Sequence, residues 1–167
     1  MSKSFRYILI SLIAVVALGA YLLRADRYPD AKSIKESHVK NDSVNPLDQK
    51  VEEALTLLQS GDAPPMTAIG MILSVLDEDP DHYSALLSLG LLSLQTGQYE
   101  NAVMRFERLL LQEQENPRVF DAAAAAYLGV GDTIMALELY HKMLNLELEQ
   151  EVREGVEETV TSLEKNL

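Results

Sequence analysis

Three alanines recur along this chain at intervals of 34 residues, and each is followed four residues later by a bulky apolar side chain. The pairs are Ala68 with Ile72, Ala102 with Phe106, and Ala136 with Tyr140. A register kept over two full periods predicts that the chain stacks copies of one supersecondary unit. Because stacked arrays offer extended surfaces on which other molecules dock, the repeat favours binding over catalysis.

The chain from residue 46 onwards has the periodicity of helices joined by short turns, without the apolar–polar alternation of strands. Asn or Asp followed by Pro is typical of a helix start, because the side chain caps orphan N–H groups and proline lacks an N–H there. Such starts are predicted at Asn45-Pro46, Asp79-Pro80 and Asn116-Pro117, and Gly61, Gly97 and Gly131 mark the turns between. The expected helices cover residues 47–59, 65–77, 81–95, 99–113, 118–128, 133–146 and 149–165.

The second and third copies resemble the tetratricopeptide repeat. The second has Leu86, Leu89, Gly90, Gly97, Tyr99, Ala102 and Phe106 where that family places its packing residues, and the third has Phe120, Ala124, Tyr127, Gly131, Ala136 and Tyr140. The first copy keeps only Ala68, Ile72 and Pro80. The resemblance implies an all-α superhelix of about three helical hairpins, residues 46–79, 80–116 and 117–147. Residues 148–167 are expected to form a C-terminal helix that caps the open end.

The residues that recur at this spacing have a packing role in the predicted array. A small alanine lets two helices approach, and a larger side chain one turn later fills the space beside it. The predicted packing residues are Ala68, Ala102, Ala136, Ile72, Phe106, Tyr140, Leu89 and Gly90. Core filling is also expected for Met66, Met71, Met104, Met135 and Met143, which lie at helical spacings.

The N-terminal region carries a long apolar segment. Residues 7–23 have no charge and are flanked by Lys3, Arg6, Arg24 and Arg27. Seventeen residues make about 25 Å of helix, near the lower limit for a bilayer. We expect residues 1–28 to be an uncleaved transmembrane anchor, with a cleaved signal peptide and a buried core helix as the alternatives.

Residues 29–45 are polar and lack hydrophobic periodicity, so they are expected to be a flexible tether. The basic residues on both sides of the apolar segment leave its orientation open. The whole organisation is similar to that of bacterial single-span proteins with tetratricopeptide domains. This likeness implies a single-pass protein of the bacterial inner membrane and favours the periplasmic side for the repeats.

Charge is distributed unevenly along the chain. Residues 1–45 carry seven basic and four acidic residues, a net charge of +3, whereas residues 46–167 carry seven basic and 22 acidic ones, a net charge of −15. An acidic domain repels phosphate backbones, so nucleic acid is not expected as a partner.

Motifs that would carry chemistry are missing from the sequence. Asp77, Asp79 and Asp81 alternate as in a calcium loop, but His82 and Ser88 stand where that loop needs glycine and an acid. His82 and His141 are isolated from other metal ligands and are expected on the surface or in a groove. No phosphate-binding loop or nucleophile elbow occurs. We therefore predict no catalytic residue, metal or cofactor, and no enzyme.

The resemblance implies that the first helix of each pair lines a partner-binding groove. Helical positions read across the second and third copies assign Leu87, Leu91, Leu94, Asp121, Ala125 and Leu128 to it. An apolar groove with an acidic rim suits an amphipathic or basic helix. The alternative is that these leucines pack against the protein's own tether or a second copy.

These observations predict a membrane-tethered scaffold or adaptor that binds a partner protein through this groove, in envelope complex assembly. The alternatives are a self-associating homo-oligomer and a non-catalytic subunit of an enzyme complex.

Overall fold

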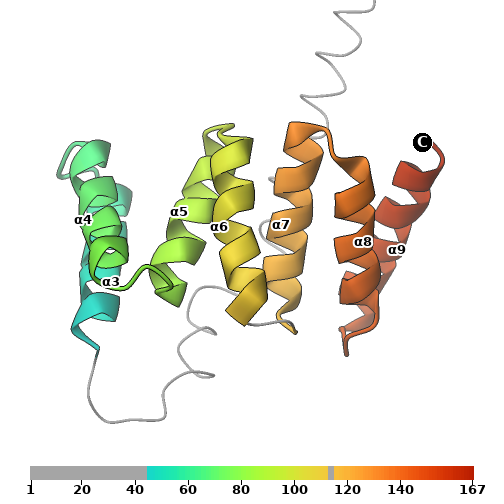
Figure 1. Ribbon diagram of the computed structural model, residues 1–167, viewed down its shortest axis with the longest axis horizontal. Coiled ribbons are helices and arrows are strands. Elements are labelled where there is room, and N and C mark those ends of the chain that lie inside the picture. The colour runs from blue at the N-terminus through green and yellow to red at the C-terminus, as the bar shows by residue number, and fades with distance from the viewer. Residues whose placement is uncertain (1–44, 113–114) are drawn as a thin grey trace, which may run out of the picture. The chain divides into compact units, whose positions relative to one another are not determined.

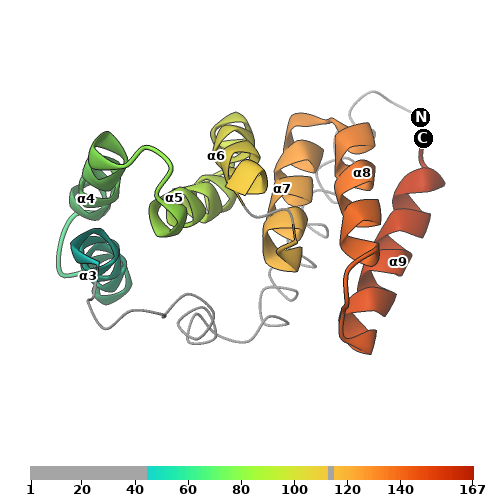
Figure 2. The same cartoon turned by 60° about the horizontal axis from the view of Figure 1, so that its bottom comes forward.

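The computed structural model describes residues 45–112 and 115–167, which belong to one compact unit, Ser43–Leu167. Within these ranges the chain is helical and has no strand. Figures 1 and 2 show the helices side by side in sequence order. They are α3 (Pro46–Ser60), α4 (Pro65–Glu78), α5 (Tyr83–Gln95), α6 (Tyr99–Gln112), α7 (Pro117–Val130), α8 (Thr133–Leu144) and α9 (Gln150–Glu164).

Local signals in the sequence begin and end several of these helices. The side chain of Asn45 accepts a hydrogen bond from the backbone N–H of Leu47, and Asn116 accepts one from Arg118, each at 3.0 Å. Gly61 and Gly131 end α3 and α7 in the left-handed conformation, with φ of 72° and 86°. Glycine adopts this region without the steric cost that a Cβ imposes. The predicted caps at Asn45 and Asn116 are therefore confirmed.

The predicted helix start at Asp79-Pro80 is wrong. Asp79 is the C-cap of α4, and α5 begins only at Tyr83, with His82 as its N-cap. The carboxylate of Asp79 instead accepts a hydrogen bond from the backbone N–H of Asp81 at 3.2 Å. This bond stabilises a turn and not a helix start. An Asp side chain can accept a backbone N–H in either structure, so the Asp-Pro pair alone does not distinguish them.

The helices pair as hairpins, α3 with α4, α5 with α6 and α7 with α8, and each hairpin packs on the next. The first helices of the hairpins form a row in which α5 contacts both α3 and α7. α9 packs against α8 and buries Val156 and Val160. The array is thus a tetratricopeptide-like stack of helical hairpins followed by one further helix.

The residues that repeat every 34 positions lie inside this array. Ala68, Ala102 and Ala136 are at most 1% exposed, and Ile72, Phe106, Tyr140 and Leu89 are at most 3% exposed. Gly90 lies against the ring of Phe106: a Cβ at position 90 would come within 2.8 Å of two ring carbons. The absence of a side chain at Gly90 therefore allows α5 and α6 to approach each other.

Not every methionine fills the core. Met143 is fully buried and Met71 packs against the core of the first hairpin. Met135 is half-buried. Met66 and Met104 are 71% and 54% exposed, so the prediction is wrong for these two. Helical spacing places a side chain on a face, but only the neighbouring helices decide whether that face is covered.

The predicted single-pass membrane location has to be corrected. In the part of the chain that the structure describes, no helix is long and apolar enough to cross a bilayer. The longest ones there, α3 and α9, have 15 residues each, whereas a span needs about 20 apolar residues. Residues 7–23, on which the prediction was based, lie outside the described residues. Nearly all of the predicted anchor (residues 1–28) and tether (residues 29–45) also lies outside the described residues. The predicted boundaries of the anchor, the tether and the repeats therefore stay predictions.

Candidate functional site

The predicted partner-binding residues lie on two neighbouring helices. Leu87, Leu91 and Leu94 share one face of α5, and Asp121, Ala125 and Leu128 share one face of α7, because each set is spaced by four and three residues. The two helices are in contact. The fold therefore brings the two sets onto one row of first helices, α3, α5 and α7.

Burial divides these six residues into two groups. Leu87, Leu94 and Asp121 are only 6–8% exposed. Leu91, Ala125 and Leu128 are half-buried. Only the half-buried group offers surface to another molecule without a rearrangement, so we define the first-helix face by Leu91, Ala125 and Leu128.

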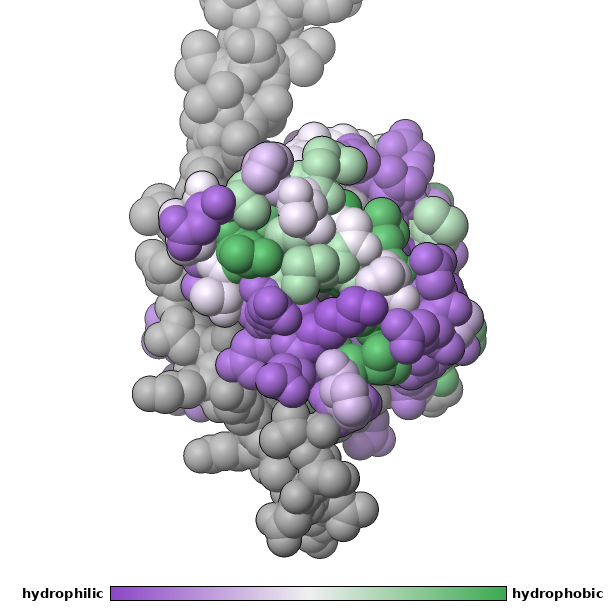
Figure 3. Space-filling model, turned by 90° about the vertical axis from the view of Figure 1, so that its left-hand side faces the viewer, coloured by the Kyte–Doolittle hydropathy of each residue, from purple (hydrophilic) through white to green (hydrophobic). Residues whose placement is uncertain are grey.

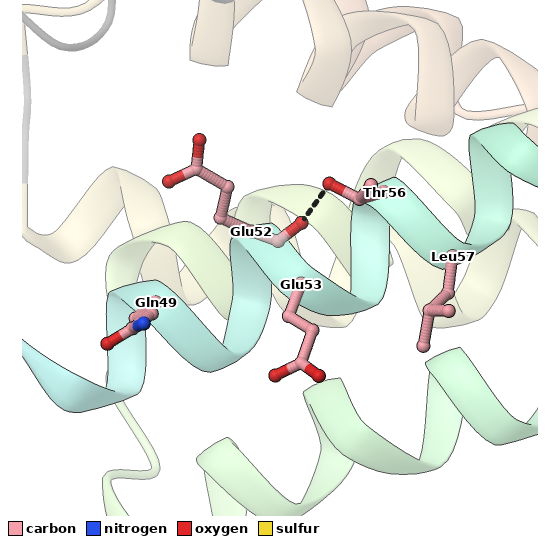
Figure 4. Close-up of a pocket in the computed structure, with 5 residues that line it drawn as sticks. All are labelled: Gln49, Glu52, Glu53, Thr56 and Leu57. Atoms are coloured by element: carbon pink, nitrogen blue, oxygen red, sulfur yellow. Dashed lines mark hydrogen bonds between the residues drawn. The ribbon is translucent and has the colours of Figure 1, made fainter.

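A depression on α3, the first member of the same row, was not among the sites predicted from the sequence. Its volume is about 430 Å³, and the described residues that line it are Gln49, Glu52, Glu53, Thr56 and Leu57. Figure 4 shows these side chains along α3, with the hydroxyl of Thr56 donating a 2.8 Å hydrogen bond to the backbone carbonyl of Glu52. Gln49, Glu52 and Thr56 are spaced by three and four residues, a signal that could have found this polar and acidic face.

His82 was expected on the surface or in a groove, and this prediction is wrong. The residue is 5% exposed and lies between α3 and α5. Its Nε2 is 3.5 Å from a carboxylate oxygen of Asp48, and the same oxygen accepts a 2.8 Å hydrogen bond from the hydroxyl of Ser84. Among the described residues the buried Nδ1 has no hydrogen-bond partner. Asp48 therefore joins the first hairpin to the start of α5. His141, in contrast, is 54% exposed, as expected.

One polar contact joins the two helices of the second hairpin, and another joins that hairpin to the third. Arg105 of α6 donates a 2.8 Å hydrogen bond to the hydroxyl of Ser93 in α5, and burial lowers the pKa of its guanidinium. Tyr127 of α7 donates a 2.6 Å hydrogen bond to the carboxylate of Glu107 in α6. Burial, this hydrogen bond and the charges of Glu107 and Asp132 raise the pKa of Tyr127 to about 12. Both pairs position helices, and neither faces a described cavity.

The described residues include no cluster of three or more His, Cys, Asp or Glu side chains that could hold a metal ion. Two carboxylates of the calcium-like run make other contacts: Asp79 accepts a hydrogen bond from the backbone N–H of Asp81, and Asp81 accepts hydrogen bonds from Arg108, the shortest at 2.6 Å.

Comparison with protein families agrees with the resemblance. Residues 48–126 match a family model described as tetratricopeptide repeat. This match covers nearly all of the degenerate first copy, the whole of the second and the beginning of the third. Comparison with curated proteins finds no match.

Solved structures share the fold at low sequence identity. One is the type III secretion translocator chaperone SycD of Yersinia enterocolitica, described as an alternative dimer, with a TM-score of 0.61 and 21% identity over 75% of this chain and 98% of that one. Another is PcrH, from Pseudomonas aeruginosa, in complex with the chaperone binding region of PopB, with a TM-score of 0.55 and 22% identity over 75% and 99%. A mutant of MamA has a TM-score of 0.61 and 15% identity over 99% and 90%. At these identities the likeness concerns the fold alone.

Proposed function

Since residues 48–126 match the tetratricopeptide repeat family, we propose that this chain is a non-catalytic adaptor that holds a segment of a partner protein against the first-helix face. The observation that carries the proposal is the row of α3, α5 and α7. It presents Leu91, Ala125 and Leu128 half-buried, with the acidic face of α3 on the same row. PcrH, which has this fold, is seen in complex with a region of PopB.

The chemistry of the face indicates the class of partner. The half-buried apolar side chains of this face favour a partner with an apolar stripe. The net charge of −15 over residues 46–167 favours a partner with basic residues beside that stripe. An amphipathic segment with Lys or Arg beside its apolar residues meets both requirements. The geometry favours a bound polypeptide over a substrate, which is why we propose no enzymatic activity.

The experiment is a crosslinking pull-down with the full chain and two variants. Ala125→Glu introduces a bulky charge on the first-helix face, and Leu111→Glu does so on α6, where Leu111 is 82% exposed. Circular dichroism checks that both variants fold. We expect the partner to be recovered with the wild-type chain and the Leu111 variant, and to be lost with the Ala125 variant.

Two outcomes contradict the proposal. Equal recovery with both variants would show that the partner binds elsewhere. Recovery of the chain alone would instead favour a self-associating protein, which light scattering would then show as a concentration-dependent oligomer.

A further inference from the structure

The outer surface of α4 is apolar and exposed. Met66 and Leu73 are 71% and 42% exposed, and Gly70 lies between them with its surface open. Spacings of four and three residues place the three on one face of the helix, which we call the α4 stripe. Figure 3 shows the end of the unit formed by α3 and α4, where apolar and weakly polar residues adjoin a hydrophilic band.

This end of the array differs from the other. Terminal repeats of stacked arrays normally carry a polar outer face, because no neighbour covers them. At the C-terminal end α9 fits that rule, since Glu151, Glu154, Glu157 and Glu158 are exposed. The α4 stripe does not, which favours a surface that another molecule covers.

Gly70 adds a second, independent observation. It lies in the middle of α4, where glycine is a poor helix former. A Cβ at Gly90 would meet Phe106 and one at Gly129 would meet Tyr99, but a Cβ at Gly70 would have no atom within 4 Å. The packing of the described residues therefore does not require glycine at position 70. Its missing side chain leaves a notch between Met66 and Leu73 where the backbone of a second helix can approach closely.

The charges around the stripe determine which occupant it fits. Asp77 continues the stripe four residues after Leu73, and Asp62 precedes Met66 by four residues in the turn before α4. Both are exposed, and the nearby cation Lys50 is paired with Glu78 at 3.2 Å. If two copies paired through this stripe, parallel helices would bring Asp77 to Asp77 and antiparallel ones Asp62 to Asp77. Like charges face each other either way, which opposes a second copy.

We propose that the α4 stripe is a second docking surface, distinct from the first-helix face, for an amphipathic helix of another protein. Apolar side chains of that helix lie over the Gly70 notch, and Lys or Arg residues at its ends face Asp62 and Asp77. The adaptor then contacts two partners, one on the row of first helices and one at the end of the array.

The test uses the full chain and two designed helical peptides as probes. Both have a leucine stripe with a central alanine, and one has lysines at its ends where the other has glutamates. Fluorescence anisotropy measures their binding to the wild-type chain and to three variants. Gly70→Met fills the notch, Leu73→Asn removes an exposed apolar side chain from the stripe, and Met104→Asn makes the matched change on α6, where Met104 is 54% exposed.

We expect the lysine peptide to bind at least about tenfold more tightly than the glutamate peptide, and Gly70→Met and Leu73→Asn each to weaken it by about tenfold. Met104→Asn should leave its affinity within about twofold. Circular dichroism confirms that each variant folds, and Gly70→Ala, whose Cβ meets no atom, supplies a folded variant with a smaller loss.

Three outcomes would overturn the proposal. The two peptides bind equally, the stripe variants bind as the wild type does, or light scattering finds a dimer that Leu73→Asn dissociates. The last outcome would assign the stripe to a second copy. None of these outcomes affects the pull-down with the Ala125 variant, so binding at the α4 stripe and binding at the first-helix face are tested independently.

Discussion

At the scale of single residues, the close contacts of the repeat depend on very small side chains. Ala102 is fully buried in α6, and Gly90 of α5 lies against Phe106. At such positions one additional methyl group has no free space, because protein interiors are packed as densely as organic crystals.

Ala102→Leu should therefore lower the free energy of unfolding by about 1–3 kcal/mol, since the larger side chain overpacks the contact of α5 with α6. Urea unfolding followed by circular dichroism measures the change. Met104→Leu in the same helix, at an exposed position, is the control and should change it by less than about 0.5 kcal/mol. Equal stabilities of the two variants would mean that Ala102 does not lie at the packed position.

Tyr127 should make stability fall at alkaline pH. Its pKa is raised to about 12 in the folded chain from about 10 in the unfolded chain. Between these values the unfolded chain loses the proton first, so the contribution of Tyr127 is complete below pH 10 and decreases as the pH rises towards 12. Urea unfolding between pH 9 and 11 should show a shallower decline for Tyr127→Phe, which cannot ionise. If the free energy of unfolding fell equally with pH in the wild-type chain and in Tyr127→Phe, the raised pKa of Tyr127 would be contradicted.

At the scale of helices, the ends of the elements depend on side-chain caps. Asn116 both accepts the N–H of Arg118 and donates a 2.9 Å hydrogen bond to the hydroxyl of Tyr83, so it joins the starts of α7 and α5. Arg153 of α9 donates to the backbone carbonyls of Leu144 and Leu146 at 2.9 and 3.0 Å, which satisfies acceptors at the end of α8.

Asn116→Ala should destabilise the chain by about 1 kcal/mol or more, because it removes a helix cap and the bond to Tyr83. Asp79→Ala provides the comparison. The sequence pattern predicted a cap at both positions, but Asp79 caps no helix start in the structure. Thermal unfolding should show the larger loss for Asn116→Ala, and the reverse order would restore the predicted helix start at Asp79.

At the scale of the whole unit, the contact between successive hairpins depends on residues outside the 34-residue pattern. Gly129, near the end of α7, lies so close to the ring of Tyr99 at the start of α6 that a Cβ would collide with it. This contact joins the second hairpin to the third, just as Asp48 with Ser84 joins the first to the second.

Gly129→Ala should therefore weaken the contact of the second hairpin with the third and destabilise the unit by about 1–3 kcal/mol. Gly70→Ala is the matched control: its Cβ meets no atom, and it should be neutral or stabilising by up to about 1 kcal/mol. Chemical unfolding of both variants measures the difference. A stable Gly129→Ala chain would show that Tyr99 moves aside without cost.

The sequence alone determined the elements and their repetition. Spacing, caps and turn glycines are local signals, so they were enough to predict the hairpins, the family and the order of the helices, with the start of α5 as the exception. Asp79-Pro80 has the residue types of a helix start, but the same two residue types are also typical of the turn that they form here.

Only the tertiary structure decided which faces of the helices are covered. It buried His82 beneath Asp48, buried Leu87, Leu94 and Asp121 within the predicted groove, and left Met66 and Leu73 exposed on α4. Burial depends on neighbours that are distant in sequence. Helical periodicity predicts which residues share a face of a helix, but it does not predict what packs against that face. The repeat and the candidate groove residues could therefore be predicted from the sequence, whereas the packed array was needed to show which groove residues are accessible and that the α4 stripe is exposed.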